Sequence, residues 1–195
     1  MRNLWFMVMA SLLLFHVSAL AQRHINGQWG VTPQLGIMDR LPTTAHLLTA
    51  GQGTVIGLDL LRYGKQERYW KVAYQYDRKY YGVLGQTLST DRHTLAFSYA
   101  PIRFTDVRRR FYLMPLMGVY GGVERINRNV LDLPEGRLLN RPTGLAGLQA
   151  AGEAEAYITS QTALFVTLQT RYLPFSTLSQ FRTAGLVGVR FTFFR

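Results

Sequence analysis

The sequence predicts an all-β protein: a small up-and-down antiparallel β-barrel of the outer membrane, with about eight strands. Three observations lead to this class. The N-terminus has the features of an export signal, apolar and polar residues alternate with period two along most of the chain, and the links between alternating segments are short and long in turn. The 195 residues include no Cys, so stability has to come from packing and backbone pairing without disulfides.

The first 21 residues contain the three parts of a cleavable secretion signal. Arg2 precedes an apolar run over 4–17, and Ala19-Leu20-Ala21 fits the small-residue cleavage pattern. The run is shorter than the roughly 20 residues that a membrane-spanning helix needs, and no second run of that length follows. We therefore expect cleavage after Ala21 and a single β-barrel domain over 22–195. Because no Cys stands at the cleavage point, a lipidated N-terminus is excluded.

The chain is strongly basic, with 22 Lys and Arg against 11 Asp and Glu, a formal net charge of +11. Arg2 is the only charged residue lost with the signal, so the charge of the mature chain is +10. Nineteen of the 22 bases are Arg, whose guanidinium binds phosphate and carboxylate through paired hydrogen bonds. Such charge suits nucleic acid, anionic lipid or an acidic protein. For an exported protein, outer-membrane lipid with its lipopolysaccharide phosphates is the simplest of these partners.

Eight segments show the period-two alternation that is typical of strands. The first sets Trp29 and Leu35 on one face and Gln28 and Thr32 on the other. The fifth is apolar on both faces and contains Pro115, so its register is left unassigned. The eight segments cover 28–38, 54–63, 69–80, 93–102, 111–122, 145–157, the stretch around 164–172, and 183–195.

Links between these segments alternate in length. Even strand number, short turns on the periplasmic side and long loops outside are typical of outer-membrane barrels. The predicted long links are 39–53, 81–92, 123–144 and 174–182, and the short ones are 64–68, 103–110 and 158–161.

Alternation alone does not tell which face is inside, because a lipocalin-like soluble barrel alternates too. Gly27-Gln28-Trp29 even matches the G-x-W that opens lipocalins. The polar face, however, is rich in small residues, which suit the narrow interior of an eight-stranded barrel. We therefore expect an outward apolar face and a packed interior that is not a pore. The small residues are Gly30, Gly36, Gly57, Ala73, Ala96 and Gly188.

Several charged residues fall on the predicted inner face. Paired carboxylates can do acid and base chemistry, but an unpaired buried charge costs several kcal/mol, so a structural network of ion pairs is the favoured interpretation. Within it, Arg171 on the next strand is expected within reach of Glu153 and Glu155. The predicted network comprises Asp59, Glu153, Glu155, Arg171 and Arg190, with Lys71 and Asp77 on the same face.

No catalytic, cofactor or metal site is predicted. His93 could act as a general base, but no Ser stands two residues after it, and Thr94 and Ser98 have no recognisable nucleophile setting. His24, His46 and His93 lack metal-ligand spacing. The glycines at 51 and 53 lack the lysine and helix of a phosphate-binding loop.

Two surfaces are predicted to meet partners. Long loops on a rigid scaffold usually carry recognition, and the loop 123–144 is rich in arginine. The outer face of the sixth segment is a strip of small residues, which lets another backbone approach closely; local steric relief is the equally simple alternative. Arg108, Arg109 and Arg110 are expected to anchor a periplasmic turn at the interface. The predicted partner-facing residues are Arg125, Arg128, Arg137 and Arg141 of the loop and Ala150, Gly152, Ala154 and Ala156 of the strip.

Several short stretches carry a resemblance to a known family. They are Gln22-Arg23, Gly27-Gln28 with Gly30-Val31, Gly36 and Asp39, Tyr80-Tyr81, Leu139-Asn140-Arg141, Glu153-Ala154-Glu155-Ala156-Tyr157, and the last strand with Gly185, Gly188 and Phe191. In this order and spacing the chain resembles the TraO family of Bacteroidetes conjugative transposons.

The resemblance implies a structural outer-membrane part of a type IV secretion-like apparatus that transfers DNA between bacteria. Its implied partners are other subunits of that apparatus and outer-membrane lipid, and direct contact with the DNA is left open. It implies no enzymatic step and no cofactor, so no catalytic residues carry over. A barrel enzyme acting on lipid or peptide and an adhesin or lipid-surface barrel remain the alternatives. The chain departs from a common barrel ending, because Arg195 follows the aromatic Phe194.

Overall fold

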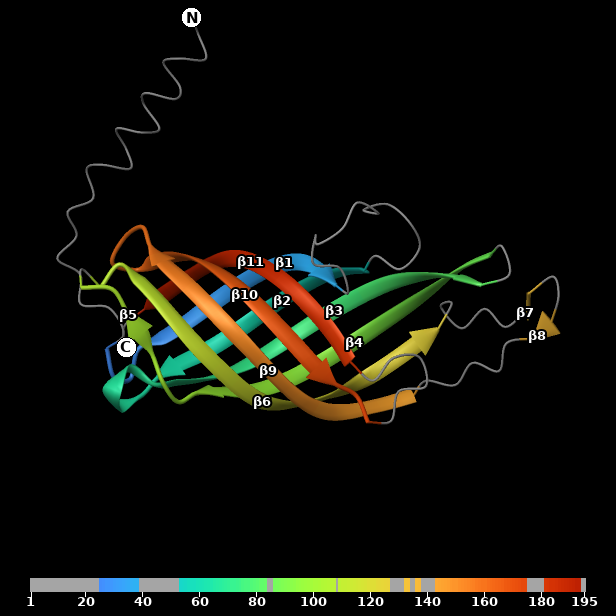
Figure 1. Cartoon of the computed structure of the whole chain (residues 1–195), viewed down its shortest axis with the longest axis horizontal. Coiled ribbons are helices and arrows are strands. Elements are labelled where there is room, and N and C mark those ends of the chain that lie inside the picture. The colour runs from blue at the N-terminus through green and yellow to red at the C-terminus, as the bar shows by residue number, and fades with distance from the viewer. Residues whose placement is uncertain are drawn as a thin grey trace, which may run out of the picture.

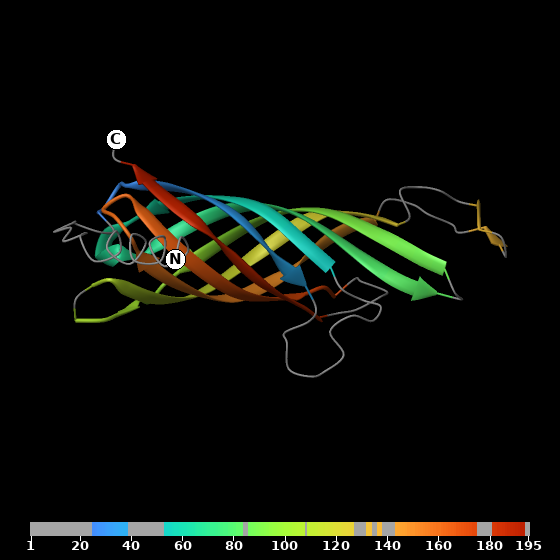
Figure 2. The same cartoon turned by 90° about the horizontal axis from the view of Figure 1, so that it is seen from above.

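Eight long strands form a closed antiparallel barrel in the computed structural model (Figures 1 and 2). The structure describes residues 25–38, 53–83, 86–107, 109–126, 132–133, 136–137, 143–174 and 181–193. Among these residues no helix is long and apolar enough to cross a membrane. The barrel strands are β1 (Trp29–Met38), β2 (Gly53–Tyr63), β3 (Tyr69–Val83), β4 (Gln86–Ala100), β6 (Phe111–Ile126), β9 (Thr143–Tyr157), β10 (Thr162–Tyr172) and β11 (Phe181–Phe193).

Each barrel strand pairs with the barrel strands before and after it in the chain, and the first strand pairs with the last. Trp29 of β1 lies opposite Phe193 of β11, which closes the wall. The short strand β5 (Phe104–Thr105) pairs with β6 beside the end of β4. Strands β7 (Asp132–Leu133) and β8 (Gly136–Arg137) form a separate ribbon. The up-and-down topology predicted from the sequence is therefore confirmed.

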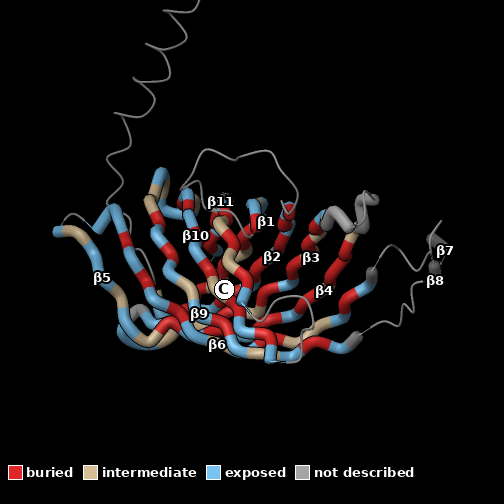
Figure 3. Tube along the Cα trace, turned by 45° about the vertical axis from the view of Figure 1, so that its right-hand side comes forward, coloured by how far each residue is buried: buried red, intermediate tan, exposed pale blue. Residues whose placement is uncertain are grey.

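Buried and exposed residues alternate along the strands (Figure 3). The exposed ones are mainly apolar and the buried ones are largely polar. Leu35 is 63% exposed and Ile56 is 62% exposed, whereas Thr32, Asp59 and Arg190 are fully buried. This is the reverse of a lipocalin-like barrel, whose apolar face lines the interior. The polar interior and apolar exterior match a strand wall that faces lipid.

The predicted fifth strand, whose register the sequence does not settle, corresponds to β6. Its even-numbered residues Tyr112, Met114 and Leu116 point inward, and Phe111 and Leu113 point outward. Both faces are apolar because the inward residues belong to a hydrophobic cluster at one end of the barrel interior. That cluster contains Leu61, Tyr63, Tyr69, Ala100, Tyr112, Met114 and Leu116.

The two ends of the barrel differ. The links 64–68, 101–110 and 158–161 lie at one end, here called the short-turn end; the opposite end is called the long-loop end. The prediction of a long loop over 81–92 is wrong, because β3 continues to Val83 and β4 already begins at Gln86. Tyr80, Tyr81 and Val83 are good strand formers, so the hairpin extends beyond its neighbours at the long-loop end (Figure 1).

Glycines in the interior make room for larger side chains. A Cβ atom on Gly57 would lie 2.8 Å from Nε2 of Gln34 and 3.0 Å from Cγ of Gln75. A Cβ atom on Gly188 would overlap the carbonyl oxygen of Pro33 and the ring of Phe165. The interior is thus filled by side chains, as expected for eight strands.

Candidate functional site

A cluster of five charged side chains crosses the interior toward the short-turn end. Nζ of Lys71 lies 2.5 Å from Oε1 of Glu153 and 3.1 Å from Oδ2 of Asp59. On the other side of Glu153, Nη2 of Arg190 lies 3.1 Å from Oε2. The same guanidinium reaches Oε2 of Glu155 through Nη1 at 3.3 Å. Strands β2, β3, β9 and β11 are therefore linked through one ion-pair chain that has Glu153 at its centre.

Neutral side chains supply further hydrogen bonds to this cluster. Tyr69 donates its hydroxyl to Glu153, and Thr167 donates to Oε1 of the same residue at 3.2 Å. Gln34 donates to Oδ1 of Asp59 at 2.6 Å. The guanidinium of Arg190 lies 5.5 Å from the ring centres of both Tyr69 and Phe165. Buried charges that are paired and hydrogen-bonded in this way are tolerated, but removing one partner is costly.

Arg171 lies in a different part of the interior. It donates to Oε1 of Gln149 at 3.1 Å, to the hydroxyl of Thr94 at 3.1 Å, and to Gln75, and it lies over the ring of Tyr120. The register explains this position, because Gln149 is the β9 residue opposite Arg171.

Glu153 lies instead opposite Thr167, four residues away from Arg171 along β10. At about 3.3 Å of rise per strand residue, this offset of four residues separates the backbone positions of Arg171 and Glu153 by roughly 13 Å along the strand direction. The structure therefore does not bring Arg171 close to Glu153 and Glu155, contrary to the prediction.

The long-loop end of the interior holds a second group of charges. Nη2 of Arg92 lies 2.7 Å from Oε1 of Glu124. Asp77, Arg171 and Arg182 line a small cavity beside this pair, with room for about one water molecule. Such a cavity is too small for a substrate or a solute path.

Buried acids and bases balance within the described part of the chain. Six acidic and six basic side chains are buried, but Asp91 lies on the outer face of β4, where it pairs with Arg78 at 2.5 Å, so the interior itself holds five acids and six bases. The acids are Asp59, Asp77, Asp91, Glu124, Glu153 and Glu155, and the bases are Lys71, Lys79, Arg92, Arg171, Arg182 and Arg190.

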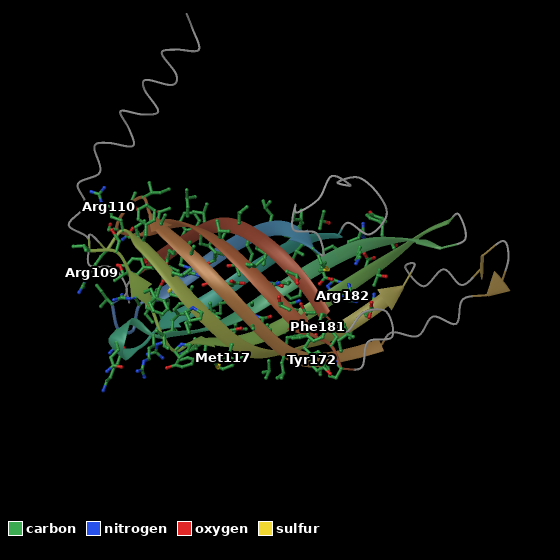
Figure 4. All side chains as sticks on the ribbon, in the orientation of Figure 1. Arg109, Arg110, Met117, Tyr172, Phe181 and Arg182 are labelled. Carbon is green, nitrogen blue, oxygen red and sulfur yellow. The ribbon has the colours of Figure 1, made fainter. Side chains whose placement is uncertain are left out.

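Aromatic side chains gather near both ends of the outer wall. At the short-turn end Trp29 and Trp70 pack edge to face at 5.6 Å, and Arg62 lies over Trp29. At the long-loop end Tyr172 and Phe181 pack at 5.1 Å (Figure 4). Exposed aliphatic side chains fill the band between them, and aromatic belts around an apolar band mark the two interfaces of a membrane protein. The band includes Leu58, Leu95, Val119, Val166 and Val187.

His93 is on the outer wall, where its Nδ1 lies 2.7 Å from the hydroxyl of Tyr74. Thr94 and Ser98 are both buried on the opposite face of β4. The wall thus separates His93 from these hydroxyls, so they do not form a nucleophile and base pair. In the part of the chain that the structure describes, no group of three or more His, Cys, Asp or Glu residues is arranged to hold a metal ion.

The strip of small residues lies on the outer face of β9. Ala150, Gly152 and Ala154 are exposed and Ala156 is half-buried. The strip has two parts, because only its short-turn end lies in a groove of about 460 Å³. The groove is lined by Phe104, Thr105, Asp106, Phe111, Tyr112, Leu113, Ala154, Glu155, Ala156, Leu164, Phe165 and Val166.

The predicted arginines of the long loop are only partly described. Arg125 is exposed at the end of β6, opposite Asp91 of β4. Arg137 belongs to β8, but its side chain is not described. Arg128 and Arg141 lie outside the described residues. The structure therefore does not bring these four residues together as a site.

Two features were missed by the sequence interpretation. Tyr69 and Gln34 hydrogen-bond the charge cluster, and their inward position in the alternation was the available signal. The sequence interpretation described the turn before β6 only by its three consecutive arginines, Arg108, Arg109 and Arg110. In the structure Oδ1 of Asp106 accepts the backbone N–H groups of Arg110 and Phe111, at 2.7 and 2.9 Å. An Asp that starts a tight turn is a recognised pattern.

A closed wall of eight antiparallel strands, apolar outside and packed with paired polar groups inside, defines a small outer-membrane β-barrel. The sequence model of the family described as conjugative transposon protein TraO matches residues 26–193. The chain belongs to this family, which confirms the resemblance found in the sequence. The comparison with curated protein sequences finds no match.

Solved structures support the fold. Neisserial surface protein A is 17% identical over 86% of this chain and 98% of its own, with a TM-score of 0.56. The N-terminal β-barrel domain of Pseudomonas aeruginosa OprF is 12% identical over 86% and 98%, with a TM-score of 0.53. Pseudomonas aeruginosa OprG is 10% identical over 90% and 100%, with a TM-score of 0.51. At these identities the likeness concerns the fold alone.

Proposed function

We propose that this chain is a structural outer-membrane component of a conjugative transfer apparatus, a type IV secretion-like assembly that moves DNA between bacteria. The observation that carries the proposal is the ion-paired, hydrogen-bonded interior of a TraO-family barrel. Among the described residues the inward-facing side chains fill this interior, and the cavity at its long-loop end has room for about one water molecule. What such a barrel can provide is a rigid wall and the surfaces on it.

The proposal includes a direction of insertion. After export and cleavage behind Ala21, the short-turn end faces the periplasm and the long-loop end faces outward. This orientation is supported by the general architecture of such barrels, whose periplasmic turns are short. It places the three short links within reach of the periplasmic parts of a secretion apparatus.

We further propose that other subunits meet the barrel at two places. One is the part of the small-residue strip outside the groove, Ala150 and Gly152, where a Cβ added to Gly152 would meet no atom within 4 Å. The other is the arginine-rich loop, with Arg125 at its start and Arg128, Arg137 and Arg141 farther along. Neither surface requires a catalytic group or a cofactor.

The test is deletion of the gene followed by complementation. Loss of the protein should abolish or strongly reduce transfer, and the wild-type chain should restore it. The mature protein should fractionate with outer membranes and migrate faster unheated than heated in mild detergent. Normal transfer without the protein, or its recovery as a soluble periplasmic monomer, would refute the proposal. A hydrolase activity of the purified barrel would favour a barrel enzyme instead.

A further inference from the structure

The groove on the outer wall is built by a hairpin that leaves the barrel. Pro101 follows β4 directly, and pairing with β6 resumes only at Phe104, opposite Leu113. The β5–β6 hairpin then leans away from the wall (Figures 2 and 3).

The floor and the walls of the groove are apolar. Ala154 lies between Leu113 of β6 and Val166 of β10, and Ala156 lies between Phe111 and Leu164 in the next row. The alanines thus form a low floor between bulkier neighbours. Phe104 on the hairpin adds to the wall on the β6 side.

Exposed basic residues stand at the short-turn end of this groove. The carbonyl of Arg110 accepts the N–H of Tyr157 at 3.1 Å, directly beyond the floor residue Ala156. Arg109, in the left-handed region with φ 52°, is exposed next to it. Figure 4 shows both arginines at the tip of the hairpin.

The local acid does not cancel this charge in full, because the turn sets one carboxylate, that of Asp106, against the two guanidinium groups of Arg109 and Arg110. Arg103 faces elsewhere: its guanidinium lies 5.0 Å from the ring centre of Tyr112, and burial lowers its pKa. The positive charge at the groove end therefore comes from Arg109 and Arg110. Val107, fully exposed at the same tip, makes the hairpin amphipathic.

We propose that this groove binds an anionic phospholipid, with one acyl chain over Ala154 and Ala156 and the phosphate held by Arg109 and Arg110. With the proposed orientation, the lipid belongs to the inner leaflet of the outer membrane. A volume of about 460 Å³ falls in the range of roughly 300–1,000 Å³ that small ligands occupy. The apolar floor and the exposed guanidinium groups at its end match the acyl chain and the phosphate of a single lipid molecule. Guanidinium groups bind phosphate oxygens through strong charge-assisted hydrogen bonds.

The test is retention of lipid by the purified mature barrel in detergent, measured by native mass spectrometry. The probes are phosphatidylglycerol and zwitterionic phosphatidylcholine. The wild type should retain phosphatidylglycerol in preference. Arg109→Gln with Arg110→Gln should weaken that binding about tenfold or more, since hydrogen bonds to charged groups are lost. Ala154→Trp and Phe104→Ser should weaken binding of both lipids by altering the groove.

Matched controls are Arg68→Gln, an exposed base on the neighbouring turn, and Ala146→Trp, an exposed alanine of the same strand outside the groove. Both should retain lipid like the wild type, and heat-dependent migration should show that every variant is folded. Equal binding of the two lipids by the wild type, or an unchanged preference in the double arginine variant, would overturn the proposal. So would loss of a co-purifying protein subunit in Ala154→Trp with lipid retention unchanged. None of these outcomes depends on whether the barrel serves in DNA transfer.

Discussion

Arg190 and Glu153 lie on strands that are not neighbours, yet their side chains meet at 3.1 Å across the barrel interior and neither is exposed. Strand β10 separates β11 from β9 in the wall. The ion pair therefore bridges the interior in addition to the backbone ladder. It ties the last strand of the barrel to the central carboxylate of the charge cluster.

We expect Glu153→Ala to destabilise the barrel by about 3–5 kcal/mol, because it leaves Lys71 and Arg190 buried without their shared partner. Unfolding in urea from detergent or lipid, followed by tryptophan fluorescence, measures this loss. Ser160→Ala in an exposed turn is the control. A change below about 1 kcal/mol would mean that the cluster is solvated and not buried.

A double-mutant cycle separates the two candidate partners of Glu153. Arg190→Met combined with Glu153→Gln should show a coupling energy of about 0.5–3 kcal/mol, as expected for groups in one network. Arg171→Met combined with Glu153→Gln should be additive within about 0.5 kcal/mol, because no contact joins them. Strong coupling of Arg171 would instead support the pairing expected from the sequence.

The purified barrel should not conduct ions in planar lipid bilayers. Ion pairs and hydrogen bonds cross its described interior, and its cavity at the long-loop end holds about one water molecule. Steady single-channel conductance of the wild type, absent from a mock purification, would contradict this. A porin measured in the same bilayers supplies the positive control.

Gly57 and Gly152 should respond differently to the same substitution. A Cβ at Gly57 would press on Gln34 and Gln75, whereas one at Gly152 would meet open space. We expect Gly57→Val to cost about 1–3 kcal/mol from overpacking, and Gly152→Val to leave stability within about 0.5 kcal/mol. Equal effects at both positions would argue against the packed interior. The measurement is urea unfolding of both variants beside the wild type.

Sequence alternation was sufficient where one face of a strand is polar. Gln28 and Thr32 against Trp29 and Leu35 already placed β1 correctly, because a polar side chain cannot face lipid at low cost. The alternation was not sufficient for β6, because the inward-facing Tyr112 and Met114 are as apolar as the outward-facing Phe111 and Leu113. An alternation of period two does not show which face of a strand points inward when both faces are equally apolar.

The details of the site depend on register, which composition does not contain. Arg171 and Glu155 seemed close because their strands are adjacent, but the pairing sets Arg171 opposite Gln149 and Glu155 opposite Phe165. The groove depends on the hairpin leaving the wall after Pro101, an arrangement in space that the strand pattern does not encode. The small-residue strip was visible in the sequence, while its division into a groove floor and an open part was not.

The open part of the strip leads to the last prediction. Gly152→Trp should leave insertion and abundance unchanged, because this position is on the outer face of β9 and a Cβ added there would meet no atom within 4 Å. If another subunit packs closely against this wall, as small residues allow, the same bulk should lower transfer frequency and co-purification of partners. Gly185→Trp is the matched control, since Gly185 on β11 also has open space around an added Cβ. Mating assays with each variant in a deletion strain compare the two. Wild-type transfer by Gly152→Trp would show that the strip is lipid-facing wall, and an equal loss with Gly185→Trp would show that the effect is not specific to the strip.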